Sequence, residues 1–278
     1  MKFLTRKGFF KIPVLGYHSL NAPGYDYQSN DHIALEQDLK LIHSEGFTVI
    51  SASVLVDILL RKRRRKLTGN YVVISFDDAP DADFYDFRHP DVGCIKSFHT
   101  LLQQYKVPAI SFVIASPEAR TELDKTCIAG RNEWRDSWWN DAIDLGLLEI
   151  GNHSWDHNHD TLETVAQRNQ EKGSFHVIDT WEDADSQIRV AERYIQNNTR
   201  HRATGLFAYP YGHSNDYLVQ QYLPDYQHQH AIKAAFTTAG QYVTPDSHRW
   251  QIPRFICGEH WKTPEELKVI LRQAISTS

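Results

Sequence analysis

Two short stretches of the sequence concentrate side chains that can bind a metal ion. "LEIGNHSWDHNHD" (148–160) carries His153, His157 and His159 directly after an apolar run, and "VVISFDD" (72–78) ends on Asp77 and Asp78. A histidine-rich stretch can be a solvated loop, so the two possible interpretations are a solvated loop and one part of a metal site. The spacing and the surrounding elements have to decide between them.

The spacing favours a metal site. His153 and His157 are four residues apart, so on one helical turn both imidazoles would face the same side and could share an ion. Two imidazoles and one carboxylate leave coordination positions open, which is typical of a catalytic site and not of a structural one. Successive strand side chains diverge. We therefore expect one of Asp77 and Asp78 to bind the ion and the other to stay beside it as an acid–base group.

The elements that must position these groups are short apolar runs alternating with helical patterns. Runs with strand character are 12–17, 47–50, 71–76, 108–115, 147–151, 205–210, 233–238 and 252–256, and helical spacing covers 33–45, 95–105, 137–146, 182–197 and 264–275. This alternation predicts βαβ units and a parallel sheet. Eight strand candidates favour a barrel over an open sheet, formed as a single domain over 1–278. The carboxyl ends of its strands would bring the polar groups to one rim.

Composition narrows the class of protein. A net charge of −5 and a pI near 6.3 give no sign of a nucleic-acid partner. The basic run 61–66 reads as a solvated helix end, with an anionic-surface patch as the alternative. No stretch approaches the roughly 18 apolar residues of a membrane span, and the N-terminus lacks a signal-peptide core. The sequence has three cysteines and no CxxC spacing, so we expect a reducing, cytoplasmic setting. The sequence does not indicate an oligomeric state.

Four segments carry a resemblance to a known family. "IPVLGYHSL", "SFDDAPDADF", "GNHSWDH" and "FAYPYG", in this order over roughly residues 10–257, resemble the polysaccharide deacetylases, which are NodB-homology domains of carbohydrate esterase type. The resemblance implies a distorted (β/α) barrel of about seven to eight parallel strands and a metal-dependent amide or ester hydrolase. It also implies roles for the residues. Asp77 would be the catalytic base, and Asp78, His153 and His157 would bind a divalent ion, most often zinc. The backbone N–H of Tyr211, after Pro210, would stabilise the oxyanion.

The sequence departs from the family pattern at three places. Ala79 stands where glycine is usual, and Ala208 stands where the family often has an arginine that pairs with the base. We hypothesise that Arg254, in "IPRF", supplies this pairing. The late histidine that acts as general acid has no clear counterpart. His260 is our first candidate, followed by His248 and His213.

Other residues of the expected rim receive weaker assignments. Trp155, Tyr209 and Pro210 are expected to contact the sugar, His159 to shape the rim, and His18 to have a structural role. The predicted reaction is removal of an N-acetyl group from an acetamido sugar of a bacterial polysaccharide or its precursor. Two alternatives stay open, namely a catalytically silent glycan-binding or scaffolding protein and a hydrolase of a non-sugar amide.

Overall fold

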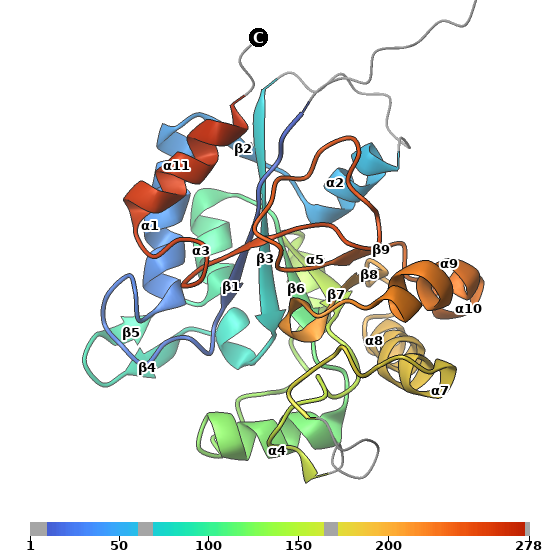
Figure 1. Ribbon diagram of the computed structural model, residues 1–278. Helices are drawn as coiled ribbons and strands as arrows, with labels where there is room; N and C mark the ends of the chain where they lie inside the picture. The colour runs from blue at the N-terminus through green and yellow to red at the C-terminus, as the bar shows by residue number, and fades with distance from the viewer. Residues whose placement is uncertain (1–9, 61–68, 164–171, 276–278) are drawn as a thin grey trace, which may run out of the picture.

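A curled parallel β-sheet occupies the centre of the molecule (Figure 1). The computed structural model describes residues 10–60, 69–163 and 172–275, so the basic run 61–66 lies outside the described residues. The strands of the sheet are β1 Val14–His18, β2 Phe47–Val49, β3 Asn70–Asp78, β6 Ala109–Val113, β7 Leu148–Asn152, β8 Leu206–Ala208, β9 Ala234–Phe236 and β10 Phe255–Ile256. Each of the eight predicted strand runs is confirmed. A hairpin of β4 Phe87–His89 and β5 Gly93–Ile95 was not predicted.

The sheet has the topology of a distorted barrel. Seven strands follow the order β10-β1-β3-β6-β7-β8-β9, with β2 paired to β3 beside this path, and all these pairings are parallel. The segment before β10 also reaches β9, because the Thr237 N–H donates to the Ile252 carbonyl at 2.8 Å and the Ile252 N–H donates to Ala235 at 2.8 Å. The segment 252–256 therefore pairs with β1 through β10 and with β9 through Ile252, so it joins the two ends of the strand order. The predicted fold class and its seven to eight strands are confirmed.

Helices cover the outside of this sheet. Figure 1 shows α1, α3 and α11 on one side of β1 and β3, and α7 to α10 on the opposite side. Their bounds are α1 Asp31–Ser44, α2 Ala52–Leu59, α3 Phe98–Tyr105, α4 Pro117–Cys127, α5 Trp139–Leu145, α7 Trp181–Ala184, α8 Val190–Asn198, α9 Leu223–Asp225, α10 Gln227–His230 and α11 Pro264–Ala274. The sequence patterns had not predicted α4, α9 and α10. Within the described ranges, none of the helices has the length and apolar character needed to cross a membrane.

Side-chain alternation along β3 separates the barrel interior from the helical layer. Ile74 and Phe76 belong to the outer core, which includes residues of α1, α3 and α11, whereas Val73 packs with side chains of β6, β8 and β9 inside the curl. Ser75 and Asp77 share the parity of Val73, because side chains two residues apart lie on the same face of a strand. The inward row of β3 therefore ends on a carboxylate at the rim.

Candidate metal centre

Three side chains from two strand ends converge at the carboxyl rim of the barrel. Asp78 ends β3, and His153 and His157 follow β7. The Nε2 atoms of both histidines lie 3.6 Å from Asp78 Oδ1, and one donor atom from each residue falls within 4.8 Å of the others. Both histidines are buried and Asp78 is half-buried. The structure thus brings together the three residues that the sequence predicts as metal ligands.

A tight turn, and not a helical turn, places the two histidines together, so that part of the prediction is wrong. Asn152 Oδ1 accepts from the Ser154 N–H at 2.8 Å, and Ser154 Oγ accepts from the His157 N–H at 2.9 Å. Asp156 Oδ1 accepts from the Asn158 N–H at 3.0 Å. Short polar side chains that bond to nearby backbone favour such turns over helix. The sequence "NHSWDHN" therefore folds into a turn whose rings face one another.

The donor set fits a divalent ion. His153 Nδ1 lies 2.8 Å from the Ala208 carbonyl oxygen, which only accepts, so Nδ1 carries the hydrogen and Nε2 keeps its lone pair toward Asp78. Burial, helped by the neighbouring His153 and His159, holds the pKa of His157 well below its usual value, so that ring is neutral. Two imidazoles and one carboxylate are ligands that suit zinc and other first-row metals. Asp78 Oδ1 lies 3.6 Å from the Nε2 atom of each histidine, a spacing that suits donors to one shared ion.

Asp77 lies beside these residues and is paired with a buried arginine. The Arg254 guanidinium donates through Nη1 to Asp77 Oδ1 and through Nη2 to Asp77 Oδ2, both at 2.7 Å. Arg254 also donates to Ser75 Oγ at 3.1 Å and to the Thr237 carbonyl at 3.3 Å, and it is fully buried. Burial alone would raise the pKa of Asp77, but the Arg254 charge and its hydrogen bonds, together with His153, hold that pKa well below its usual value. The contact hypothesised for Arg254 is present.

His18 also reaches this carboxylate. It is paired in register with Asp77 across β1 and β3, and its Nε2 lies 3.8 Å from Asp77 Oδ2. Its side chain is about one-third exposed and lines the same cavity as the proposed ligands. The sequence reading favoured a structural role for His18, whereas the structure places it among the reactive groups. The alternation Val14, Gly16, His18 was the signal for this inward position.

The rim has a concentration of left-handed backbone at residues other than glycine. Asp78, Ala79, Ser154, His157 and Tyr211 all have φ between 57° and 73°. Such conformations cost about 1–3 kcal/mol each and persist where surrounding contacts fix them, often at functional sites. Ala79, at φ 57°, occupies a backbone position that suits the family's usual glycine.

Tyr211 lies in a short 3₁₀ turn, Pro210–Gly212, directly after β8. Its ring centroid is 4.4 Å from that of His157 in an edge-to-face arrangement. Its backbone N–H makes no hydrogen bond to the described part of the chain, and its buried hydroxyl likewise finds no partner there. Burial, with Asp160 and Asp78 nearby, raises the pKa of this hydroxyl. A free backbone donor at the edge of the cavity is what an oxyanion site requires.

The predicted contact of Tyr209 with the sugar is wrong. Tyr209 is fully buried, packs on Phe207 and donates its hydroxyl to the Trp250 carbonyl at 2.9 Å. Trp155 packs edge-on against Tyr194, Pro210 is buried, and neither residue lines the cavity. Tyr209 faces away because it lies two residues after Phe207, on the outer face of the sheet.

The candidate acid His260 also lies outside the cavity lining. Its Nδ1 accepts from the Ile256 N–H at 2.9 Å, and its ring packs under Gly240 so closely that a Cβ there would meet it at 2.3 Å. Because its Nδ1 is hydrogen-bonded and its ring is tightly packed, His260 supports the chain near Gly240. Of the other candidates, His213 stacks on His176 and His248 lines a second cavity.

The reactive groups line a cavity of about 300 Å³. Besides the residues already placed there, it is lined by Trp134, whose indole N–H donates to the Asp78 carbonyl at 3.0 Å, and by Cys127 and His159. A volume of this size lies at the lower end of those that hold small ligands. The arrangement can bind one cation, keep a carboxylate ionised beside it, and offer a backbone donor and an imidazole to a bound group.

Comparison with known proteins finds similar sequences in one family. The sequence profile of the family described as polysaccharide deacetylase matches residues 64–231. The poly-β-1,6-N-acetyl-D-glucosamine N-deacetylase of Staphylococcus epidermidis is 25% identical over 203 residues, which cover 73% of this chain and 60% of that protein. A protein of the same name from Staphylococcus aureus is 24% identical over 209 residues, 74% of this chain. The match thus spans about 60% of the length of these relatives.

Solved structures share the fold. IcaB from Ammonifex degensii has a TM-score of 0.65 at 18% identity, covering 96% of this chain and 98% of that one. The Streptococcus pyogenes deacetylase PplD, in complex with acetate, has a TM-score of 0.61 at 17% identity, with coverage of 96% and 98%. At these identities the similarity establishes the architecture alone.

Proposed function

Because this chain belongs to the polysaccharide deacetylase family, we propose that it removes N-acetyl groups from glucosamine units of a glycan such as poly-β-1,6-N-acetyl-D-glucosamine. The observation that carries the proposal is the position of Asp77. This carboxylate is kept ionised by Arg254 and lies directly beside three residues, Asp78, His153 and His157, that can share a cation. A metal-dependent acetamide hydrolase needs a cation site and a base in this proximity.

Asp78, His153 and His157 would hold the ion, which we expect to be zinc. A bound divalent ion would acidify a water molecule and polarise the acetamide carbonyl. Asp77 is the proposed base, accepting a proton at Oδ2, the oxygen that faces His18 and His153 at 3.8 and 3.9 Å. The Tyr211 N–H is the proposed donor to the negative charge that develops on the carbonyl oxygen.

His18 is the proposed proton donor to the leaving amine. It replaces His260 in this role because it lines the cavity and lies across from Asp77, whereas His260 does neither. A base and an acid on adjacent strands can act on the two sides of one scissile bond without a conformational change.

Metal content and turnover together test the proposal. Elemental analysis of the purified protein is expected to find about one divalent ion per chain, and the Asp78→Ala/His153→Ala variant is expected to lose it. His159→Ala is the matched control, because His159 lines the same cavity outside the three-residue group. Release of acetate from β-1,6-linked N-acetylglucosamine oligomers should fall at least about 100-fold in Asp77→Asn and in His18→Ala.

Three results would contradict the proposal in different ways. Metal bound as firmly by the double variant as by the wild type would remove the ligand assignment. Metal bound by the wild type with no acetate released from any glucosamine oligomer would favour a non-sugar amide. Absence of metal even after incubation with zinc would favour a silent glycan-binding protein.

A further inference from the structure

A π-helical turn bonds to the segment that carries the two histidines. The turn is Asp185–Arg189, between α7 and α8, and helical backbone continues on both sides of it. Turns of this kind are rare and occur frequently at functional sites. Two of its consecutive residues, Gln187 and Ile188, bond to residues 152–158, which we call the metal-ligand turn. The contacts of these two residues indicate what the π-helical turn does.

The residue before His153 is one of those that the π-helical turn holds. Asn152 donates through Nδ2 to the Ile188 carbonyl at 3.1 Å and to Glu192 Oε2, in α8, at 3.2 Å. Its Oδ1 accepts from the Ser154 N–H, so the same side chain also shapes the metal-ligand turn. The ring of His153 is oriented in addition by its own hydrogen bond to β8.

The residue before His157 is held at both its side chain and its backbone. Gln187 Nε2 donates to Asp156 Oδ1 at 2.6 Å, and the Asp156 N–H donates to Gln187 Oε1 at 3.4 Å. Both residues are almost completely buried. Asp156 Oδ1 also accepts from the Asn158 N–H, so Gln187 bonds to the carboxylate that closes this part of the metal-ligand turn.

His157 depends on this support more than His153 does. Within the described part of the chain, the buried Nδ1 of His157 has no hydrogen-bond partner, whereas His153 Nδ1 bonds to the Ala208 carbonyl. Metal-binding histidines almost always use the second ring nitrogen in a hydrogen bond that fixes the ring. The backbone of His157 is left-handed, with φ 64°, and its N–H donates to Ser154 Oγ. The position of the His157 ring is therefore set by the metal-ligand turn and by the packing of the ring.

We propose that Gln187 is a positioning residue, which holds His157 in place for the metal ion by fixing Asp156. The proposal rests on the proposed function, because it assumes the ion expected at the three proposed ligands. Gln187 does not line the cavity around them, so it acts through His157 and not on a bound group. Outer partners of metal ligands typically contribute about 10–100-fold to metal affinity.

Zinc binding by Gln187→Met tests this role. Methionine keeps the length and unbranched shape of glutamine but removes both hydrogen bonds to Asp156. Calorimetric titration of chelator-treated protein with zinc should give a Kd raised about tenfold or more over the wild type. Gln187→Asn, whose shorter side chain falls short of Asp156, should raise the Kd in the same direction.

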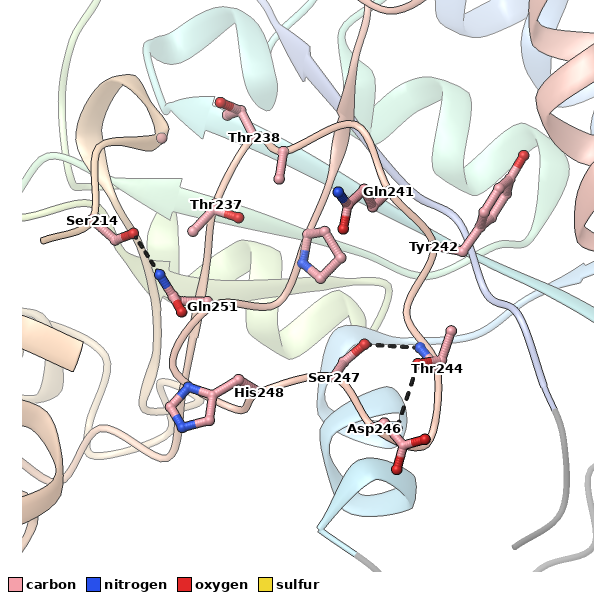
Figure 2. A pocket seen from close by; sticks show the side chains of 13 residues that line it. Ser214, Thr237, Thr238, Gln241, Tyr242, Thr244, Asp246, Ser247, His248 and Gln251 are labelled. Carbon is pink, nitrogen blue, oxygen red and sulfur yellow. Dashed lines mark hydrogen bonds between the residues drawn. The ribbon is translucent and has the colours of Figure 1, made fainter. Parts of the chain in front are cut away.

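The control replaces a glutamine that makes similar bonds away from the metal centre. Gln251 is unsuitable, because it lines the second cavity, of about 580 Å³, and donates there to Ser214 Oγ (Figure 2). Gln227 lines neither of the two cavities. Its Nε2 donates to the Ile232 carbonyl at 3.1 Å, and its Oε1 accepts from Arg249 Nη2 at 3.2 Å. Gln227→Met should bind zinc as tightly as the wild type.

A double-mutant cycle separates the positioning of His157 from a general loosening of the site. If Gln187 acts through His157, Gln187→Met should not weaken zinc binding further once His157 is replaced by alanine. The same change should keep its effect in the His153→Ala background. Any other pattern of losses, including no loss in the wild-type background, would overturn the proposal.

Wild-type protein that binds no zinc would contradict the proposed function, and a measurement without metal then tests the hold of Gln187 on His157. The His157 N–H donates to Ser154 Oγ at 2.9 Å, so its hydrogen exchange reports on the metal-ligand turn. Faster exchange in Gln187→Met than in Gln227→Met would support the positioning role. Equal exchange in the two variants would overturn it.

Discussion

Replacing Arg254 by methionine should strongly destabilise the fold, because it leaves the Asp77 carboxylate buried without its counter-ion. Arg254 is fully buried and makes two 2.7 Å hydrogen bonds to Asp77. Its guanidinium also lies 5.4 Å from the Phe112 ring centroid, and methionine keeps much of that packing volume. The loss of one partner of a buried pair costs about 3–5 kcal/mol.

A double-mutant cycle isolates the pairing from the other contacts of Arg254. Asp77→Asn should itself be destabilising, because it leaves the guanidinium buried against a neutral amide. When both changes are combined no unpaired charge remains. The double variant should therefore lose at least about 2 kcal/mol less free energy of unfolding than the sum of the two single variants.

Urea unfolding of protein dialysed against a chelator, followed by circular dichroism, measures the four free energies without a contribution from metal. Arg272→Met is the control, since Arg272 pairs with Glu45 largely in solvent and should change the unfolding free energy far less. Additive single and double variants would refute the reasoning. They would mean that Asp77 is neutral or solvated in the folded protein.

Changes at three further positions test other parts of the structure. Ala79→Gly should alter the unfolding free energy by less than about 1 kcal/mol, because relief of the left-handed backbone at φ 57° offsets the greater freedom of the unfolded chain. Ala79→Val should cost more than about 2 kcal/mol in the same urea unfolding assay, and equal effects of the two changes would argue against the backbone strain. Tyr209→Phe should lower the unfolding free energy by about 1–2 kcal/mol, because it leaves the Trp250 carbonyl unpaired. KM for any substrate should stay unchanged, and a raised KM would support the predicted contact of Tyr209 with the sugar. Burial raises the pKa of Asp38 to about 7, above its unfolded value near 4, so its contribution to stability is lost as the pH rises through 7. Asp38→Asn should flatten the decline in unfolding free energy between about pH 4 and about pH 7, the unfolded and folded pKa values, and an unchanged slope would contradict the assignment.

Most of the barrel could be predicted because its strands are buried on both faces. Runs such as "YVVISF" are continuously apolar, as expected for interior parallel strands, and turn residues separate them clearly. The rim followed from the same argument, since polar residues directly after parallel strands meet at one edge. His153, His157 and the pair of Asp77 and Asp78 were found in this way, and the family resemblance assigned Asp78 as the expected ligand.

What the sequence did not reveal depends on the direction of side chains and on the pairing of strands. Tyr209 shares the outer face with Phe207, a two-residue relation that was available but was given less weight than its position at the rim. His18 meets Asp77 only because β1 pairs with β3 in one particular register. That register is a tertiary fact, set by the packing of both sheet faces.

Few backbone pairs join β7 to β8, and the residues of the candidate site lie on both sides of this join. Asn152 and Phe207 form one register pair there, whereas β6 and β7 share five. The two histidines follow β7 and Tyr211 follows β8, so the position of the Tyr211 N–H relative to the two imidazoles depends on this join. The hydrogen bond from His153 to Ala208 crosses the same line. The bond that orients the His153 ring therefore also ties the ends of the two strands together where they share the fewest register pairs.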